Sequence, residues 1–440
     1  MDYLYFIMAL YFINFFFGVK LLLNNNLNFA NMFYTLILII ILPILTPLIF
    51  LFTYLDERIR KKFIKKRTYD ISNIPQLKEQ ETTQHNSLEL FTNGELLFEN
   101  IFEEIEHAQH FIHISFFTFN TDKIGKLFIS KLEQKLKQNV NVIILYDPLG
   151  SYTMRKKHFK NFLKLGGELV SFVNFKNHFL NLNYRNHRKV LIIDNKICYI
   201  GGFNIGDKYL GRNKKLGLWI DSELKITGRA VNTIEKRFLA DYMYCTRKKI
   251  DINQFLLEHQ FDDHKQVEII TSGVDINDLN QIENKLIHLI YNAEKYIYLQ
   301  TPYLILNDCI IKALKYAANK GVEIKIMLPN KNDHPFVLQA TKAYASLLTD
   351  KNITIYLFNK NAFLHSKVFI SDDHYSSVGT TNLDIRSFKY SLEINAFIND
   401  ITFAEYLKKI YLKQITYCTV YTNKKNKLSE SLCKLLSTIL

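Results

Sequence analysis

Two long hydrophobic runs open the chain, and from about residue 91 onward amphipathic helix patterns alternate with strand patterns. The runs cover residues 3–23, broken only by Asn14 and Lys20, and residues 32–55, which contain no charge. A bilayer is crossed by about 20 apolar residues, so both runs are long enough. The first run lacks the basic start and small-residue cleavage site of a signal peptide. The pattern therefore predicts two transmembrane helices.

The distribution of basic residues predicts the orientation of this hairpin. Residues 24–31, between the two runs, carry no charge, whereas residues 56–67 carry seven Lys and Arg. The positive-inside rule places such a segment in the cytoplasm, so we expect the N-terminus and the rest of the chain on that side. The basic segment completes a membrane unit of residues 1–67. The polar, aperiodic residues 68–90 are interpreted as a linker.

An internal repeat organises the remainder of the chain. An amphipathic helix that runs directly into a strand occurs twice, at residues 101–119 and 286–304. Further strand patterns follow in matching order, at residues 140–147 and 169–173 in the first copy and at 322–329 and 353–357 in the second. Alternating helices and strands indicate a layered α/β fold. We expect two similar α/β domains, at residues 91–255 and 265–440.

The strongest part of the repeat comes last in each copy. Residues 187–204 and 365–382 both read His-x-Lys-x4-Asp-x6-Gly-x2-Asn. The paired positions are His187 and His365, Lys189 and Lys367, Asp194 and Asp372, Gly201 and Gly379, and Asn204 and Asn382. A single copy would be weak grounds for a site. Two copies with every interval equal, in two repeated halves, indicate one shared function.

These residue types suit the chemistry of a phosphodiester. A His and a Lys two residues apart on a strand point to the same face, and each glycine allows a tight turn at which the backbone approaches an anion. The Lys and Asn donors would neutralise the phosphate oxygens. One His would attack phosphorus while the other exchanges protons with the alcohols. This spacing suggests no metal site, and an Asp at the end of each buried strand is expected to bind backbone donors.

A catalytic histidine needs an acceptor for its second ring nitrogen. Asp221 and Glu393 each lie in a strand-like segment, LWIDSELKI and SLEINAFI. Each follows one of the two histidines by about 30 residues. We interpret Asp221 and Glu393 as the carboxylates that orient the two histidines.

Composition and charge narrow the class of partner. The chain is 48% hydrophobic, which excludes disorder as its main state. Five scattered cysteines form no disulfide or zinc pattern, and they favour a reduced compartment. The formal charge is +14; residues 56–67 contribute +5 and Asp2 offsets Lys20, which leaves +9 on residues 68–440. A basic chain favours nucleic acid, an anionic membrane or a phosphate-bearing substrate.

The doubled motif resembles the paired HKD motifs of the phospholipase D superfamily, over roughly residues 91–420. Within it, residues 182–211 and 363–388 resemble bacterial cardiolipin synthases, as do the shorter segments 116–125, 146–151 and 301–306. The resemblance implies two phospholipase D-like α/β domains, related by pseudo-two-fold symmetry, with one active site between them. It implies phosphatidyl transfer between two phosphatidylglycerol molecules through a phosphatidyl-histidine, giving cardiolipin and glycerol. It also implies that His187 is the nucleophile and His365 the acid and base, with Lys189, Lys367, Asp194 and Asp372 completing the catalytic motifs.

The resemblance further implies a multi-pass protein of the bacterial cell membrane with cytoplasmic catalytic domains. Its partners would be phosphatidylglycerol and the anionic bilayer; we expect no nucleic acid, no cofactor and no metal. The same motifs would also serve a hydrolytic phospholipase D, a phosphatidylserine synthase or a nuclease, the last of which the +9 charge favours. A membrane scaffold with a spent site is the remaining alternative.

Overall fold

The computed structural model describes residues 5, 11–12, 14–15, 82–172, 184–258, 263–273, 280–331, 333 and 337–422. The described elements from Thr82 onward belong to one compact unit. The predicted membrane spans at 3–23 and 32–55 lie outside the described residues, apart from five residues near the N-terminus that are helical. Within the described ranges, no helix has both the length and the apolar character needed to cross a bilayer.

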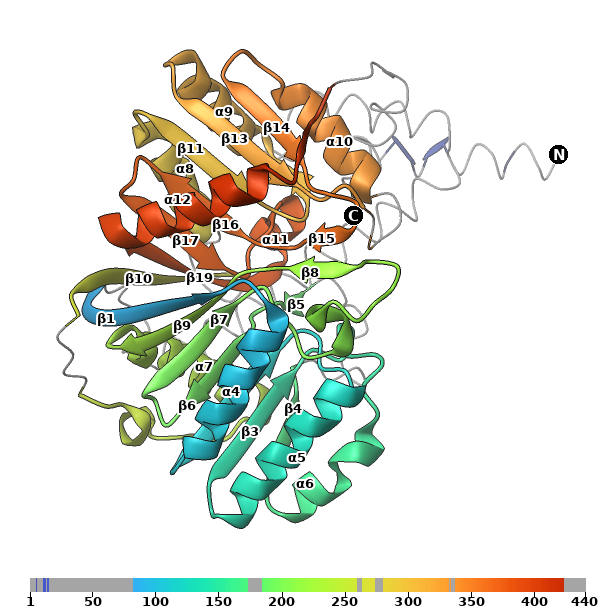
Figure 1. Ribbon diagram of the computed structural model, residues 1–440. Coiled ribbons are helices and arrows are strands. Elements are labelled where there is room, and N and C mark those ends of the chain that lie inside the picture. The colour runs from blue at the N-terminus through green and yellow to red at the C-terminus, as the bar shows by residue number, and fades with distance from the viewer. Residues whose placement is uncertain are drawn as a thin grey trace. The chain divides into compact units, whose positions relative to one another are not determined.

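One large mixed sheet of 16 strands runs through the described part of the chain (Figure 1). Its order is β20-β14-β13-β11-β16-β17-β19-β10-β1-β9-β7-β6-β2-β3-β4, with β5 paired to β19. The strands of the first half are β1 (Thr82–Phe91), β2 (Phe111–Phe116), β3 (Asn141–Tyr146), β4 (Glu168–Ser171), β5 (Arg185–Asn186), β6 (Val190–Ile193), β7 (Ile197–Gly201) and β9 (Glu223–Gly228). Those of the second half are β10 (Lys265–Ser272), β11 (Tyr296–Gln300), β13 (Glu323–Leu328), β14 (Ile353–Leu357), β16 (Val368–Ser371), β17 (Tyr375–Gly379), β19 (Ser391–Asn399) and β20 (Thr419–Val420).

The order of the strands repeats from the two ends of the sheet. Reading inward, β14-β13-β11-β16-β17-β19 corresponds to β4-β3-β2-β6-β7-β9, with β10 and β1 in the middle. The chain therefore carries two copies of one α/β arrangement, as the internal repeat predicts. The two copies share a continuous sheet.

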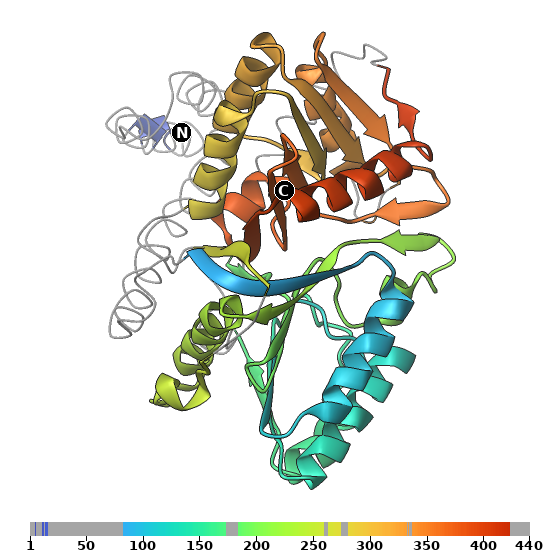
Figure 2. The ribbon, with the colours of Figure 1, turned by 60° about the vertical axis from the view of Figure 1, so that its left-hand side comes forward.

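Helices cover both faces of the sheet. In the first half, α4 (Gly94–His107) and α5 (Lys123–Lys137) pack on one face and α7 (Ala230–Thr246) packs on the other, as Figure 2 shows. The larger helices of the second half are α8 (Gln281–Asn292), α9 (Asp308–Asn319), α10 (Val337–Leu348) and α12 (Ile401–Ile415). Short helical segments are η2 (Lys156–Phe159), α6 (Lys160–Lys164), η4 (Asp207–Leu210), η5 (Ile252–Phe255) and α11 (Ile385–Lys389).

The unbroken hydrophobic run of β3 follows from this double cover. Val142 and Ile144 pack with α4 and α5, whereas Ile143 and Leu145 pack with α7. Successive side chains of a strand point to opposite faces, so a strand buried on both faces must be apolar at every position. The parallel pairing of β2 with β3 and of β3 with β4 is the pairing that such buried strands adopt.

The interpretation of residues 68–90 as a linker is wrong from Thr82 onward, because β1 is a strand of the central sheet. It pairs antiparallel with β9 of the first half and with β10 of the second. Its polar residues obscured the strand pattern, yet they are satisfied: the buried Asn86 amide donates to the Thr83 and Lys265 carbonyls. The first copy of the repeat therefore starts with β1, just as the second starts with β10.

Two short strand pairs cross between the halves and position the site. β5 pairs in parallel with β19, and β15 (Ala362–Leu364) pairs in parallel with β8 (Leu218–Ile220). A further pair joins β12 (Leu304–Ile305) to β18 (Leu383–Asp384). The residues immediately before each motif histidine thus lie against a strand of the opposite half.

Candidate active site

Both motif histidines lie where a crossing strand meets a buried strand of its own half. His187 follows β5 and precedes β6, and its backbone amide donates to the Leu392 carbonyl at 3.0 Å. His365 follows β15 and precedes β16, and its amide donates to the Ile220 carbonyl at 2.7 Å. The buried strands β6 and β16 are confirmed as predicted. Each histidine backbone is therefore fixed by the opposite half.

Each histidine is also oriented by a carboxylate of the opposite half. His187 Nδ1 lies 2.9 and 3.0 Å from the two Glu393 carboxylate oxygens, and His365 Nδ1 lies 2.6 Å from Asp221 Oδ2. A carboxylate only accepts, so it favours the tautomer with the proton on Nδ1. That tautomer leaves a lone pair on Nε2 of each ring. The predicted contacts are present, but they are exchanged between the halves.

Burial keeps both imidazoles neutral. It lowers the pKa of His187, against the attraction of Glu393. Burial, reinforced by the Lys367 ammonium, lowers the pKa of His365 to about 4, against the attraction of Asp221. A neutral ring with an unprotonated Nε2 is the form that a nucleophile or a general base requires.

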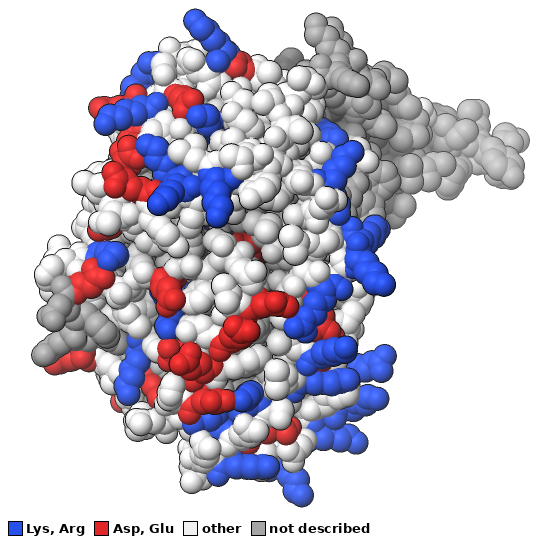
Figure 3. Space-filling view, in the orientation of Figure 1, with Lys and Arg blue, Asp and Glu red and all other residues white. Residues whose placement is uncertain are grey.

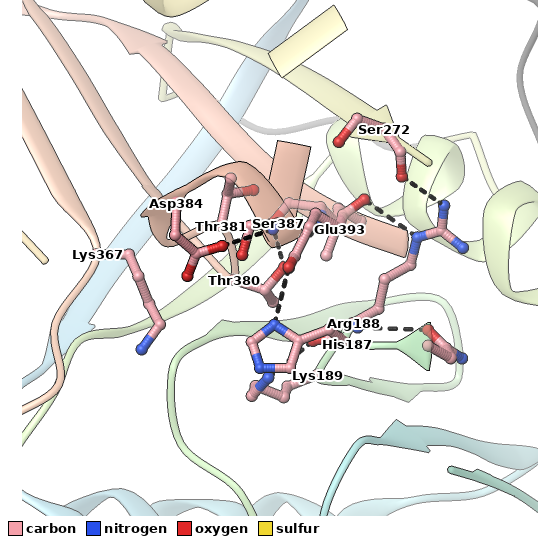
Figure 4. A network of polar contacts seen from close by, with 12 residues as sticks. His187, Arg188, Lys189, Ser272, Lys367, Thr380, Thr381, Asp384, Ser387 and Glu393 are labelled. Atoms are coloured by element: carbon pink, nitrogen blue, oxygen red, sulfur yellow. Dashed lines mark hydrogen bonds and ion pairs between the residues drawn. The ribbon is translucent and has the colours of Figure 1, made fainter. Parts of the chain in front are cut away.

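Each motif lysine lies beside the histidine of its own motif, as Figure 4 shows for Lys189 and His187. Lys189 Nζ donates to the His187 carbonyl at 2.7 Å, and Lys367 Nζ donates to the His365 carbonyl and lies 2.7 Å from His365 Nδ1. Burial, reinforced by the charge of Lys367, lowers the pKa of Lys189 to about 7, whereas Glu393 opposes the shift. Burial also lowers the pKa of Lys367 to about 8. An anion bound between the lysines would stabilise both ammonium charges.

A further carboxyl group, Glu223, lies buried next to Asp221. Burial raises its pKa far above the usual range, and the charge of Asp221 raises it further. Asp221 itself has a lowered pKa, because Lys367 and His365 outweigh the effect of burial. Glu223 accepts from the Phe203 amide at 3.2 Å, and the matching acceptor in the second half is the Asn395 amide oxygen, 3.2 Å from the Thr381 amide. A protonated Glu223 thus occupies the place of a neutral amide.

The motif aspartates lie at the far ends of the buried strands. Asp194 accepts from the amides of Gln109, His110 and Phe111 at 2.7–2.8 Å. Asp372 accepts from the amides of Glu294, Lys295 and Tyr296 at 2.8–2.9 Å. Six residues lie between each histidine and its aspartate, four of them in the buried strand, so the two side chains are roughly 20 Å apart along the chain. Both contact sets match the sequence interpretation that these aspartates bind backbone donors, and both hold the chain entering a strand rather than facing the histidines.

Close packing against a neighbouring strand, and not the predicted tight turn, explains why the motif has a glycine at these two positions. Gly201 and Gly379 end strands β7 and β17, and neither has a positive φ. A Cβ on Gly201 would lie 2.2 Å from the Ser222 carbonyl oxygen, and one on Gly379 would lie 2.3 Å from Asn395 Oδ1. The absence of a side chain therefore allows the neighbouring strand, which continues from the orienting carboxylate, to approach closely.

The motif asparagines are buried behind these glycines. Asn204 Oδ1 accepts a hydrogen bond from the Thr118 amide at 2.9 Å. The side-chain nitrogen of Asn204 therefore points away from Thr118. Asn382 occupies the equivalent position in the second half and is equally buried. Their predicted contact with phosphate oxygens stays a prediction.

Sequence reasoning missed two residues that support the site. Thr380 Oγ1 donates to Glu393 Oε2 at 2.5 Å. The buried Arg188 donates to the Glu393 carbonyl at 3.1 Å and to Asp241 on α7 at 2.7 Å. Both residues lie within the repeated motifs, next to a predicted residue. Their position beside motif residues was the available signal. The two copies differ at both positions, since Arg188 corresponds to Ser366 and Thr380 to Gly202, so a search for residues shared by the copies does not find them.

Aromatic rings lie against both imidazoles. The Phe117 ring meets His187 edge to face, with centroids 5.0 Å apart, and the Trp219 ring lies 4.8 Å from His365. Trp219 Nε1 also donates to Asp221 Oδ2 at 3.2 Å. These rings limit access of water to the histidines and hold their orientation.

The arrangement combines two oriented neutral imidazoles, two lysines and buried amides, with each imidazole held by the other half. Among the described residues, no group of three or more His, Cys, Asp or Glu is placed to hold a metal ion. Donors of this kind suit an anionic phosphodiester, and duplicated His-x-Lys motifs in one sheet define the phospholipase D class of phosphoryl-transfer protein.

The comparison with known families is more specific. The model of the family described as cardiolipin synthase, phospholipase D-like domain, matches residues 101–242 and 286–415. The chain belongs to this family, which confirms the resemblance seen in the sequence.

Curated relatives agree with the family match. Cardiolipin synthase 1 of Staphylococcus epidermidis is 41% identical over 370 residues, which cover 81% of this chain and 75% of the relative. The major cardiolipin synthase ClsA of Bacillus subtilis is 38% identical over 372 residues, covering 81% and 76%. The crystal structure of phosphatidylserine synthase from Haemophilus influenzae covers 85% of this chain and 98% of that one, with a TM-score of 0.62. Its identity of 14% shows similarity of fold alone.

Proposed function

We propose that this phosphatidyltransferase is a cardiolipin synthase, which transfers the phosphatidyl group of one phosphatidylglycerol to a second, reversibly, and releases glycerol. The observation that carries the proposal is the exchange of carboxylates: His187 is bound by Glu393 and His365 by Asp221. Two imidazoles prepared in the same way allow one to bond phosphorus while the other moves protons. Family membership supports lipid as the substrate class.

In the first step, His187 Nε2 attacks the phosphorus of a bound phosphatidylglycerol. The P–N bond forms, the bond from phosphorus to the glycerol head group breaks, and His365 gives a proton to the departing glycerol oxygen. The resting pKa of His365 is about 4, and the negative phosphodiester raises it, because an opposite charge favours the imidazolium. The products of this step are a phosphatidyl-histidine and free glycerol.

In the second step, His365 acts as a base toward the incoming lipid. It takes the proton from a head-group hydroxyl of a second phosphatidylglycerol as the oxygen attacks phosphorus. The P–O bond forms, the P–N bond breaks, and His187 returns to its neutral form as cardiolipin leaves. Equal numbers of phosphodiester bonds are broken and formed, so the reaction is reversible and needs no external energy source.

Lys189 and Lys367 stabilise the charge that develops on the phosphate oxygens during both steps, and Asn204 and Asn382 add amide donors. Glu393 stabilises the positive charge that His187 acquires on bonding phosphorus. These roles need no cofactor. Asp194 and Asp372 support the strands that carry the motifs.

The proposal includes the arrangement at the membrane. Residues 1–67 form a hairpin that anchors the protein in the bacterial cell membrane, and two phospholipase D-like domains extend over the rest of the chain on the cytoplasmic side. Phosphatidylglycerol and the anionic bilayer are the partners. The relatives named cardiolipin synthase, all from bacteria, support this placement.

The test is an assay of the purified full chain with phosphatidylglycerol labelled in the phosphate, followed by thin-layer chromatography. We expect labelled cardiolipin and an equal amount of glycerol. Phosphatidic acid as the sole product would show a hydrolase, and absence of turnover would show a spent site. His187→Ala should abolish both product and the label retained on alkali-denatured protein. His288→Ala, on the surface of α8, is the matched control and should retain wild-type activity; wild-type turnover in His187→Ala would remove this residue from the mechanism.

A further inference from the structure

A basic and partly apolar surface lies beside the first half of the site. Residues 148–167 contain five Lys and Arg and no Asp or Glu. The five cations are exposed: Arg155, Lys156, Lys157, Lys160 and Lys164. Among them, three large apolar side chains face solvent, with exposed fractions of 45% for Leu149, 80% for Tyr152 and 49% for Leu163. We call these eight residues the 149–164 surface.

The cations of this surface differ from many other lysines in that no carboxylate of the described residues pairs with them. Elsewhere many lysines are paired, as Lys131 is with Glu106 and Lys225 with Glu104. Within the described parts of the chain, no ion pair involves a cation of the 149–164 surface. Figure 3 shows Lys and Arg gathered along the edge of the first half where α5 and α6 lie. The surface therefore presents an open positive charge to an anionic partner.

The surface is joined firmly to the segment that carries His187. The buried Asp147 accepts from the amides of Leu149 and Gly150 at 2.9 and 3.3 Å, and also from the Asn186 amide at 3.2 Å. One carboxylate thus ties the start of the surface to the residue before His187. Three hydrogen bonds to this carboxylate therefore hold the start of the surface next to the residue before His187.

A second connection runs through Phe117. Ser151 Oγ donates to the Phe117 carbonyl at 3.0 Å, and the Phe117 ring meets the His187 ring edge to face. Gly150 packs so closely on Phe117 that a Cβ there would lie 2.3 Å from the Phe117 carbonyl oxygen. Leu149 and Tyr152 are therefore the sequence neighbours of the two residues that contact Phe117, which borders the proposed nucleophile.

We propose that the 149–164 surface docks the catalytic part on an anionic lipid bilayer. Leu149, Tyr152 and Leu163 enter the interfacial layer, where an aromatic ring with a polar tip is stable. The five cations bind lipid phosphates at the same level. Docking in this way brings the His187 side of the site against the source of lipid. The link to substrate delivery rests on the proposed function, whereas docking itself does not.

The apolar residues favour a bilayer over nucleic acid. Basic charge alone would serve either partner. Exposed leucines gain nothing from stacking on bases, but they gain from leaving water for the acyl region. Tyr152 and Arg155 suit either partner, so the two exposed leucines, Leu149 and Leu163, decide in favour of the bilayer.

Fluorescence quenching by brominated lipid tests docking directly in the full chain. The protein has one tryptophan, the buried Trp219, and its emission in the wild type is the background that is subtracted. In Tyr152→Trp, reconstituted in vesicles of phosphatidylglycerol brominated near the head of the acyl chain, we expect at least half of the added emission to be quenched. Tyr316→Trp, at an exposed site on α9, is the matched control and should be quenched no more than the wild type.

Quenching of Tyr152→Trp at the level of the control would overturn the proposal. A response of its emission to single-stranded DNA, with none to brominated vesicles, would overturn it in favour of nucleic acid. Because the readout is not activity, either result stands even if the chain makes no cardiolipin.

Activity on two physical forms of substrate tests delivery. The double change Leu149→Ser and Tyr152→Ser should lower turnover of phosphatidylglycerol in vesicles at least fivefold, and should change turnover of a short-chain phosphatidylglycerol, dispersed as monomers, less than twofold. Lys156→Glu with Lys157→Glu should act alike and should lose its effect at high salt. Equal loss on both substrates, or loss on neither, would contradict delivery through this surface.

Discussion

The exchange of carboxylates makes a quantitative prediction for Glu393→Gln. The glutamine side chain has the same shape, so the buried strand β19 keeps its packing. The change removes the negative charge beside His187 and leaves one acceptor oxygen where there were two, at 2.9 and 3.0 Å from Nδ1. Thr380, which donates to the second oxygen, would then face an amide nitrogen.

The magnitude follows from the charge that His187 acquires when it bonds phosphorus. A hydrogen bond to a charged group contributes about 1.5–3 kcal/mol, against about 1 kcal/mol for a neutral one. The two charge-assisted contacts, about 3–6 kcal/mol together, are replaced by one neutral bond of about 1 kcal/mol, so the transition state should lose about 2–5 kcal/mol, centred on about 3–4 kcal/mol. Since about 1.4 kcal/mol is a factor of ten, kcat should fall roughly 10²- to 10³-fold. The midpoint of thermal unfolding should change little. The variant loses a hydrogen bond to His187, but it also no longer buries a negative charge, and the two effects oppose each other.

The assay is single-turnover formation of labelled product from phosphatidylglycerol in mixed micelles, with the thermal midpoint measured alongside. Thr380→Val is the matched control: it removes one donor but keeps the carboxylate, and its kcat should fall less than tenfold. A Glu393→Gln enzyme within threefold of wild type, with its fold intact, would refute the assignment of Glu393 as the group that stabilises the His187 cation.

Other predictions test the remaining parts of the site. The lysine charges are lost as the pH rises through the lowered pKa values, about 7 for Lys189 and about 8 for Lys367, so kcat/KM should decline above about pH 7. In Lys189→Arg, which stays charged, a pH–rate profile should show the decline only from about pH 8, where Lys367 loses its charge, and an unmoved decline would count against Lys189. Asp194→Asn should lower the free energy of unfolding, measured by urea titration, by about 2 kcal/mol. Activity per folded molecule should stay within twofold of the wild type. A selective loss of kcat would mean that Asp194 acts in catalysis. Arg188→Met should cost about 3 kcal/mol of stability by the same titration, because it breaks a buried ion pair; an unchanged midpoint would be the contrary result. EDTA should leave activity largely intact, whereas complete loss that added metal restores would refute the metal-free mechanism.

Much of the site could be predicted because its strands are short and fully buried. The run VLII is wholly apolar, and VFIS is apolar except for its last residue, the buried Ser371, so both are strands buried between the helical layers. The positions of Asp194 and Asp372 followed from these runs, since an acceptor at a strand end meets free backbone amides. Equal spacing in two copies then indicated a shared role for the histidines.

The partners of the histidines could be named but not matched. Local spacing shows that Asp221 and Glu393 lie in strands, yet spacing within one half says nothing about which half a strand faces. The exchange depends on the parallel pairing of β5 with β19 and of β15 with β8. These pairs involve two and three residues, too few to leave a hydrophobic pattern. β1 was not recognised for a related reason: hydrogen bonds to both neighbouring strands stabilise it, and its apolar residues are confined to its last four positions, Leu88, Leu90 and Phe91.

The reciprocal hold on the histidines bears on why the two copies reside in one polypeptide. A fragment containing only the first copy would keep His187 but lack Glu393, and two such fragments would have to associate symmetrically to complete a pair of identical imidazoles. Covalent fusion removes that symmetry: Thr380 stands where the first copy has Gly202, which leaves room for Asp221. Duplication followed by divergence can therefore give the two rings separate duties, which an assembly of identical fragments could not do.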